Sequence, residues 1–104
     1  MSLVLVLFNL HPETAPANYE SWAKTTDLPL LRGLNSVRAA DLYRTVGLLG
    51  TGESAPYDYV EILNIEDYRE FGRDILGREL QRAADQFHRF TDNPIFIKLE
   101  PVEA

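Results

Sequence analysis

The order in which strand-type and helix-type patterns follow one another constrains the fold of this chain most strongly. The first apolar run, residues 3–10, does not alternate with polar residues, which predicts a strand covered on both faces. Near the other end, apolar residues recur at three- and four-residue spacing from Asp67 to Phe87, which predicts an amphipathic helix. The complete set of expected elements is strands at residues 3–10, 36–48, 57–65 and 94–102 and helices at residues 16–26 and 67–87.

This order of strand, helix, strand, strand, helix and strand is typical of the ferredoxin-like fold, an α+β arrangement. It predicts one domain over residues 1–104, with a four-stranded antiparallel sheet and both helices on one face. Strand 57–65 alternates, and we expect Tyr59 and Leu63 on the face that no helix covers. Together with strand 3–10, this face would expose a large apolar patch in a monomer. We therefore expect a homodimer whose two sheets pack face to face as a dimeric α+β barrel.

Charge, cysteine content and the length of the apolar runs exclude several classes of function. The net charge of −6, from 16 acidic and 10 basic residues, argues against non-specific nucleic-acid binding. The chain has no cysteine, which excludes disulfides, thiolate chemistry and cysteine-ligated clusters. The apolar run 3–10 is shorter than the ~20 residues that span a membrane, and no basic residue precedes it as in a secretion signal. We expect a cytoplasmic protein that binds neither nucleic acid nor membranes.

The connector Thr25–Val37 is the first place to expect a ligand, because it is polar and conformationally restricted. Thr26, Asp27 and Arg32 place a hydroxyl, a carboxylate and a guanidinium within a few residues of each other. We expect these groups to orient a polar substituent of a substrate at the rim of a pocket. The alternative is that Arg32 is solvated or paired with Asp27.

Proline and glycine set the expected limits of this connector. Pro29 fixes its own φ and disfavours the helical conformation at Leu28, so we expect the helix 16–26 to end before it. Gly33 permits a turn of the backbone. The alternative is that Asp27 caps a short second helical turn, which Gly33 ends.

Glu61 is the best single candidate for a catalytic group. It lies in the middle of a strand among apolar neighbours, where loss of water would raise the pKa of its carboxyl into a range suited to acid or base work. The alternative is a structural carboxylate, paired with Arg38 or Arg44 on the preceding strand or placed at the dimer interface. The sequence leaves both open.

Aromatic residues and one histidine are the other candidates. The expected second proton-transfer group is Tyr59, which shares a strand face with Glu61, or His11. The alternative for His11 is a solvated loop position. Trp22 and Tyr43 are expected to form a flat substrate pocket, although helical spacing also suits Trp22 to the core. No spacing of histidines and carboxylates indicates a metal, and no motif indicates a cofactor. We expect neither.

Five segments in order along the chain form a recognisable set. They are Tyr19-Glu20-Ser21-Trp22, Thr26-Asp27-Leu28-Pro29, Arg32-Gly33-Leu34-Asn35-Ser36-Val37, Pro56-Tyr57-Asp58-Tyr59-Val60-Glu61 and Phe71-Gly72-Arg73-Asp74. Together they resemble the RedY-like, HapK-type branch of the dimeric α+β barrel superfamily. The resemblance implies a small dimeric protein of prodiginine-type (prodigiosin) pigment pathways, where relatives are linked to maturation of a bipyrrole aldehyde by dehydration of a hydroxylated ring.

The function that we expect is that of a cofactor-independent lyase, dehydratase or isomerase acting on an apolar, partly aromatic metabolite. Elimination of water requires a base for a carbon-bound proton, an acid for the departing hydroxyl and a pocket that excludes solvent. The alternatives are a non-catalytic small-molecule carrier or stress-responsive protein, and a cofactor-independent monooxygenase.

Overall fold

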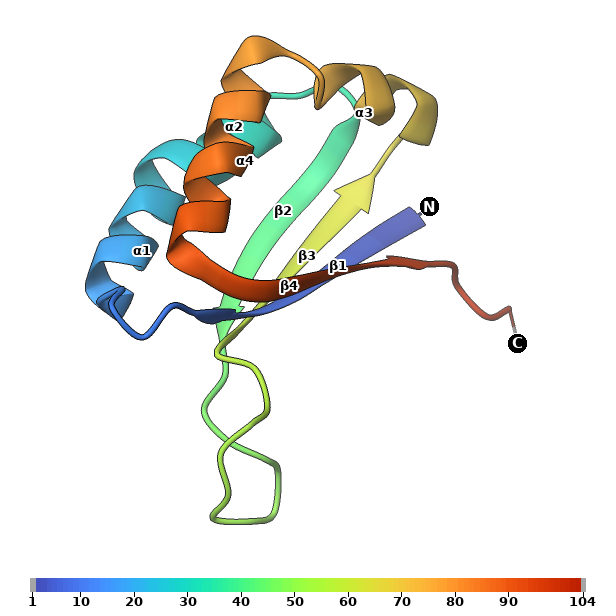
Figure 1. Ribbon diagram of the computed structural model, residues 1–104. Coiled ribbons are helices and arrows are strands. Elements are labelled where there is room, and N and C mark those ends of the chain that lie inside the picture. The colour runs from blue at the N-terminus through green and yellow to red at the C-terminus, as the bar shows by residue number, and fades with distance from the viewer. Residues whose placement is uncertain (1, 104) are drawn as a thin grey trace.

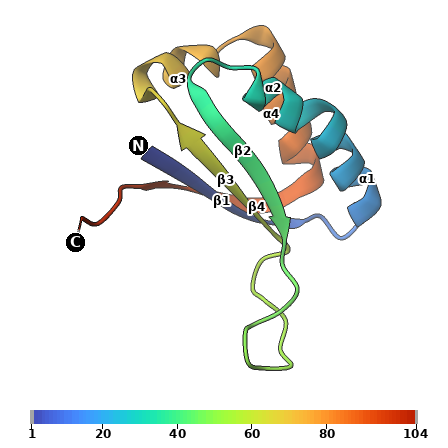
Figure 2. The same cartoon turned by 180° about the vertical axis from the view of Figure 1, so that it is seen from behind.

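The computed structural model describes residues 2–103 and has a four-stranded antiparallel sheet covered by helices on one face. Figures 1 and 2 show the helices gathered on the same side of the sheet. The order of the strands across the sheet is β2, β3, β1, β4, which is the ferredoxin-like order expected from the sequence. The elements are β1 (Ser2–Leu10), α1 (Pro16–Trp22), the π-helix η1 (Ala23–Asp27), α2 (Leu28–Arg32), β2 (Val37–Arg44), β3 (Tyr59–Ile65), α3 (Tyr68–Asp74), α4 (Arg78–Phe90) and β4 (Thr91–Leu99).

The core lies between the sheet and the helix layer. On β1, alternate residues Val4, Val6 and Phe8 are buried beneath the helices, while the residues between them are only half-buried. In a single chain, β1 is therefore fully buried on one face only and not on both faces as expected. At the centre of the core, the ring centroid of Phe8 lies 5.5 Å from that of Tyr19 on α1 and 5.0 Å from that of Phe87 on α4. Aromatic packing thus joins the first and last helices to the sheet.

The expected orientation of β3 was wrong. Tyr59 and Leu63 lie on the face beneath the helices, where they are 2% and 5% exposed. Val60 and Ile62 are the residues that point to the uncovered face, where they are half-buried. Antiparallel pairing of Tyr59 with Phe8 fixes this register, because paired residues share a face of the sheet. Glu61, which lies between Tyr59 and Leu63 on the same face of β3, therefore also points into the core.

The expected end of the first helical segment before Pro29 was also wrong. The chain continues through η1 and α2 as far as Arg32, and Leu28 has helical φ and ψ of −61° and −43°. Pro29 stands at the start of α2, where a missing N–H is tolerated. Burial of Leu28 and Leu31 against the core outweighs the local preference of the residue before proline. Gly33 takes the C-cap position, as the alternative interpretation required.

The second helical segment is divided into α3 and α4 where a single helix was expected. Asp67 caps α3, and its carboxylate accepts hydrogen bonds from the backbone N–H groups of Arg69 and Glu70. Gly77 interrupts the segment in an extended conformation and takes the N-cap position of α4. Glycine is a poor residue for the interior of a helix and is accepted at an N-cap, but Gly72 lies inside α3, so propensity alone does not place the break.

The uncovered face of the sheet is apolar, and a long hairpin extends beyond it. Ile95 and Ile97 on the edge strand β4 are 41% and 38% exposed on this face. Between β2 and β3, residues 45–58 project away from the body of the protein (Figures 1 and 2), and the side chain of Leu49 is fully exposed. The strands β2 and β3 are consequently shorter than expected. Within residues 2–103, no helix has the length and apolar character needed to cross a bilayer.

Candidate active site

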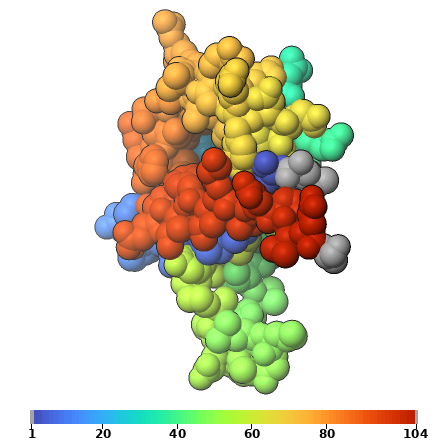
Figure 3. Space-filling view, turned by 90° about the vertical axis from the view of Figure 1, so that its right-hand side faces the viewer, coloured from blue at the N-terminus to red at the C-terminus, as the bar shows by residue number. Residues whose placement is uncertain are grey.

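A cavity of about 250 Å³ lies between the sheet and the helices. Its walls are mostly aliphatic and aromatic, with Val6 and Leu63 from the sheet and Phe87 from α4 among them. Figure 3 looks onto the edge strand β4, and the surface is hollowed between β4 and the helices α3 and α4. Phe96 on β4, which is 57% exposed, and His88 on α4 also line the cavity. An apolar cavity of this kind is the default position for a small-molecule site.

Two carboxyl groups, those of Glu61 and Asp27, are the acidic side chains in the wall of this cavity. Glu61 is 5% exposed and Asp27 is 8% exposed. Burial raises the pKa of Glu61, and the nearby charge of Asp27 raises it further. Burial also raises the pKa of Asp27. Neighbouring carboxyls with little access to water resist holding two negative charges, so the pair retains a proton at a pH where an exposed carboxyl has lost it.

Within residues 2–103, Glu61 is not the partner of an arginine, which was its alternative role. Arg44 binds Glu20, and Arg38 forms an ion pair with Glu66 at 3.3 Å between Nε and Oε2. The Oε2 atom of Glu61 is buried and has no hydrogen-bond partner in the part of the chain that the structure describes. A buried carboxyl without a cation or a full set of donors reduces stability, so its presence calls for another explanation.

The π-helix explains how Asp27 reaches the cavity. Tyr19, Ala23 and Asp27 follow one another at intervals of four residues, and all three are buried. In a regular α-helix, residues eight apart have drifted around the axis, whereas the wider turn of a π-helix reduces that drift. Helix η1 therefore keeps Asp27 on the same buried face as Tyr19. No pattern in the sequence identified the π-helical turn, but the four-residue spacing of Tyr19, Ala23 and Asp27 was visible.

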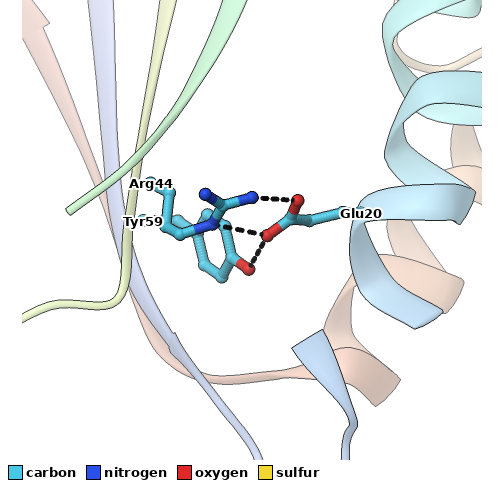
Figure 4. Close-up of polar contacts among 3 residues, drawn as sticks. All are labelled: Glu20, Arg44 and Tyr59. Atoms are coloured by element: carbon cyan, nitrogen blue, oxygen red, sulfur yellow. Dashed lines mark hydrogen bonds and ion pairs between the residues drawn. The ribbon is translucent and has the colours of Figure 1, made fainter. Parts of the chain in front are cut away.

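Tyr59 lies on the same strand face as Glu61, but its hydroxyl is engaged elsewhere. It donates a hydrogen bond of 2.6 Å to Oε2 of Glu20, and Arg44 donates two bonds of 2.9 and 2.6 Å to the same carboxylate (Figure 4). The hydrogen bonds from Arg44 and then Tyr59 lower the pKa of Glu20 to about 2. Burial, and to a smaller extent the hydrogen bond to Glu20, raises the pKa of Tyr59 to about 12. Tyr59 thus joins β3 to α1, and its hydroxyl is not free to serve Glu61 in this arrangement.

The other expected catalytic residue, His11, is outside the cavity. It lines a separate, more open hollow after the end of β1, together with Arg44, Thr45 and Asp58. The carboxylate of Asp58 accepts a hydrogen bond from the backbone N–H of Leu10 in the same region. The structure therefore does not bring His11 and Glu61 into one site.

Of the expected substrate-binding residues, only Asp27 lines the cavity. Arg32 donates to the backbone carbonyl of Ala40 at 2.9 Å and pairs with Asp41 at 3.5 Å, so neither solvation alone nor pairing with Asp27 describes it. Tyr43 is 54% exposed and lies on the uncovered face of the sheet. Thr26 is half-buried beside Asp27.

Trp22 is a core residue, which was the alternative to its expected place in a substrate pocket. The indole packs against the core and its N–H donates a hydrogen bond of 2.8 Å to Oε1 of Gln86 on α4. Sequence reasoning missed Phe71, Phe96 and His88 as residues of the cavity wall. Helical spacing had placed Phe71 in the apolar stripe, but it gave no means of telling a cavity wall from a filled core. Among residues 2–103, no three histidine or acidic side chains are grouped so as to hold a metal ion.

Comparison with known proteins places this architecture in a family. The sequence model described as REDY-like protein HapK matches residues 2–102, nearly the whole chain. The chain belongs to the REDY-like HapK family. The crystal structure of HapK from Hahella chejuensis is similar over 100% of this chain and 95% of that one, with a TM-score of 0.77 and 23% identity. No curated protein sequence matches the chain.

Two further solved structures share the fold of this family member. One is SnoaB, described as a cofactor-independent oxygenase from Streptomyces nogalater, with a TM-score of 0.76, 16% identity and coverage of 99% of this chain and 94% of that one. The other is a dimeric protein of unknown function and ferredoxin-like fold from Bacteroides fragilis, with a TM-score of 0.67, 12% identity and coverage of 95% and 94%. At these identities the likeness concerns the fold alone.

The buried pair predicts how stability depends on pH. The folded pKa values of Glu61 and Asp27 are raised above the ordinary values of 4.5 and 3.8, so the folded state holds protons that the unfolded state has released. The free energy of unfolding should therefore fall as pH rises above about 4.5, by about 1.4 kcal/mol for each unit of pKa shift. Glu20, with its lowered pKa, acts oppositely and loses its contribution as pH falls from 4.5 to about 2.

Urea unfolding of the wild type and of Glu61→Gln at several pH values measures this dependence. We expect the loss of stability above pH 4.5 to be smaller in Glu61→Gln, because glutamine does not ionise and the charge that raises the pKa of Asp27 is gone. Identical pH profiles for the two proteins would contradict the raised pKa values.

Proposed function

We propose that this protein is a cofactor-independent enzyme of lyase or isomerase type that acts on an apolar, partly aromatic small molecule. The observation that carries the proposal is the pair of buried carboxyls, Glu61 and Asp27, in the wall of an otherwise apolar cavity. Such a pair reduces stability, and groups with strongly shifted pKa values in cavities are characteristic of catalytic sites.

The pair contains the groups that a dehydration requires. When Glu61 and Asp27 share one proton, the ionised carboxylate can remove a proton from a substrate carbon, and the neutral carboxyl can donate its proton to the departing hydroxyl. The C–H and C–O bonds break, a C=C bond forms and water leaves, while the pair still holds one proton. An isomerisation uses the same two groups without loss of water. The apolar walls exclude solvent that would compete for these protons.

Membership of the HapK family supports a role in secondary metabolism. The sequence resemblance extends this proposal to a pyrrolic substrate of a prodiginine-type pathway, converted by dehydration of a hydroxylated ring. The cavity volume of about 250 Å³ is sufficient for a ligand of one or two rings. His11 and Tyr59 take no part in this proposal, because the second proton-transfer group is Asp27.

A cofactor-independent oxygenase is the second candidate. The structural neighbour SnoaB bears that description and covers 99% of this chain. In such a reaction a carboxylate would deprotonate the substrate before O₂ reacts with it. Consumption of oxygen during turnover separates this candidate from a lyase. If the bound compound is released unchanged, the protein is a carrier and not an enzyme.

We also propose that the chain forms a homodimer through the uncovered face of the sheet. The half-buried and exposed aliphatic side chains of this face would be covered by a second copy. A structural neighbour is described as dimeric. The side chains concerned are Leu3, Leu5, Leu7, Val60, Ile62, Ile95, Ile97 and Leu99.

Native mass spectrometry of the gently purified protein tests both proposals. We expect a dimer that retains a small organic molecule. The released compound, incubated with substoichiometric fresh protein and no added cofactor, should be converted over many turnovers, with loss of water or no change in mass when air is excluded. A compound that is bound but never converted would contradict the enzymatic proposal, and a monomer would contradict the dimer.

A further inference from the structure

The wall of the cavity holds a buried negative charge for which residues 2–103 supply no positive partner. Glu61 and Asp27 are both buried and both line the cavity. Oε2 of Glu61 has no hydrogen-bond partner, and neither carboxyl forms an ion pair with a basic side chain in that range. With one proton held between them, the two groups still carry one negative charge at neutral pH. Buried carboxylates are normally paired, so this charge calls for a partner.

The other polar side chains of the wall do not provide that partner. Among the residues that the structure describes, no lysine or arginine lines the cavity. The side-chain amide of Gln81 is uncharged and already donates a hydrogen bond of 2.7 Å to the backbone carbonyl of Ile75. His88 is exposed, its ring packs edge-on against Phe87, and it forms no ion pair within residues 2–103. A ligand in the cavity can supply the positive charge that the pair lacks.

The aromatic part of the wall also suits a cation. Phe71 on α3, Phe87 on α4 and Phe96 on β4 line the cavity, and the ring centroids of Phe87 and Phe96 are 6.2 Å apart. The face of an aromatic ring attracts a nearby cation, and the same rings offer contact to the apolar part of a ligand. The surface is hollowed beside β4 (Figure 3), which gives a ligand a way in.

We propose that the cavity binds an aromatic ligand that carries one positively charged nitrogen, and that Glu61 and Asp27 hold this nitrogen. The N–H groups of a protonated amine or nitrogen heterocycle donate charge-assisted hydrogen bonds to the two carboxyls, Oε2 of Glu61 included. A ligand hydroxyl could form such a bond but would leave the negative charge without compensation. A ligand carboxylate would add a second negative charge to the site.

This inference narrows the substrate class of the proposed function and rests on it only in taking the cavity as the ligand site. Three probes of similar shape test it without turnover. They are 2-naphthylmethylamine, which is protonated at neutral pH, the uncharged 2-naphthylmethanol and the anionic 2-naphthoate. Their affinities are measured by calorimetry at neutral pH and physiological ionic strength, where exposed charges are largely screened. We expect the amine to bind at least about tenfold more tightly than the alcohol, and the carboxylate to bind most weakly.

The double variant Glu61→Gln/Asp27→Asn should abolish the preference for the amine and leave the affinity for the alcohol within a few-fold of the wild type. Both residues are replaced because either carboxyl alone can still carry the single negative charge. The matched control is Glu53→Gln/Glu66→Gln, which removes two exposed carboxylates outside the cavity wall. This control should keep the preference.

Equal affinity for the amine and the alcohol in the wild type overturns the inference, as does the absence of binding by all three probes. An equal loss for both probes in the cavity double variant assigns the pair to the architecture of the wall. A matching loss of preference in the control assigns the effect to the overall charge of the protein, and either result overturns the inference. Failure of turnover with the preference intact counts against the proposed function alone, whereas turnover of a released compound without any preference counts against this inference alone.

Discussion

Glu61→Gln is expected to lower turnover by about 10²- to 10⁴-fold, the usual contribution of a group that transfers a proton in the transition state. Glutamine has nearly the same shape as glutamate and keeps one carbonyl oxygen, so the cavity should retain its ligand with an affinity within a few-fold of the wild type. A loss confined to the chemical step would identify proton transfer as the role of Glu61. The measurement is kcat and KM on the compound released from the purified protein.

Glu66→Gln provides the control for this experiment. Glu66 follows β3 directly, and its side chain is 55% exposed and paired with Arg38 rather than facing the cavity. The same change of charge at this position should leave kcat and KM unchanged. Turnover by Glu61→Gln at the wild-type rate would contradict the assignment of Glu61, and a matching loss in Glu66→Gln would indicate a general effect of charge.

Phe8→Ala is expected to cost about 3–5 kcal/mol of folding free energy, which is a large part of the stability of a domain of this size. Phe8 is 0% exposed, and its ring packs on Tyr19, Tyr59 and Phe87, which come from α1, β3 and α4. Truncation leaves a void that these rigid rings cannot fill by small movements. The midpoint of thermal unfolding should fall by at least about 12 °C.

Leu49→Ala is the comparison for that substitution. Leu49 is fully exposed in the hairpin between β2 and β3, so its truncation should change the free energy of unfolding by no more than about 0.5 kcal/mol. Both variants are measured by urea and thermal unfolding. A change below about 1 kcal/mol in Phe8→Ala would mean that the aromatic cluster is not the centre of the core.

The strand and helix order could be predicted from the sequence because apolar periodicity reports which residues share a face. The face of β3 could not be predicted, because alternation separates two sets of residues without saying which set the helices cover. Here Val60 and Ile62 are as apolar as Leu63, so the choice depended on pairing with Phe8 across the sheet. The continuation of the helix through Pro29 depended similarly on burial of Leu28 and Leu31, a tertiary effect.

The candidate site was predictable in its central residue and not in its partners. Glu61 stood out as a charged residue in an apolar strand, and Asp27 was expected near a ligand for a different reason. The two residues are close because of the π-helix and because Glu61 lies on the face of β3 that the helices cover. Neither feature leaves a distinct signature in the sequence. Tyr59 was chosen because it shares a strand face with Glu61, and His11 because it follows the end of the first strand. The structure engages Tyr59 with Glu20 and places His11 in a different hollow.

The most direct test of a proton-sharing pair in the cavity is the titration of the Glu61 and Asp27 carboxyl carbons by NMR, in protein with ¹³C-labelled glutamate and aspartate. Resonances are assigned with the Glu61→Gln and Asp27→Asn variants. We expect both carboxyls to titrate above their ordinary pKa values of 4.5 and 3.8, and Asp27→Asn to lower the pKa of Glu61 by removing the neighbouring charge. Titration of Glu61 near 4.5, unaffected by Asp27→Asn, would contradict a proton-sharing pair in the cavity.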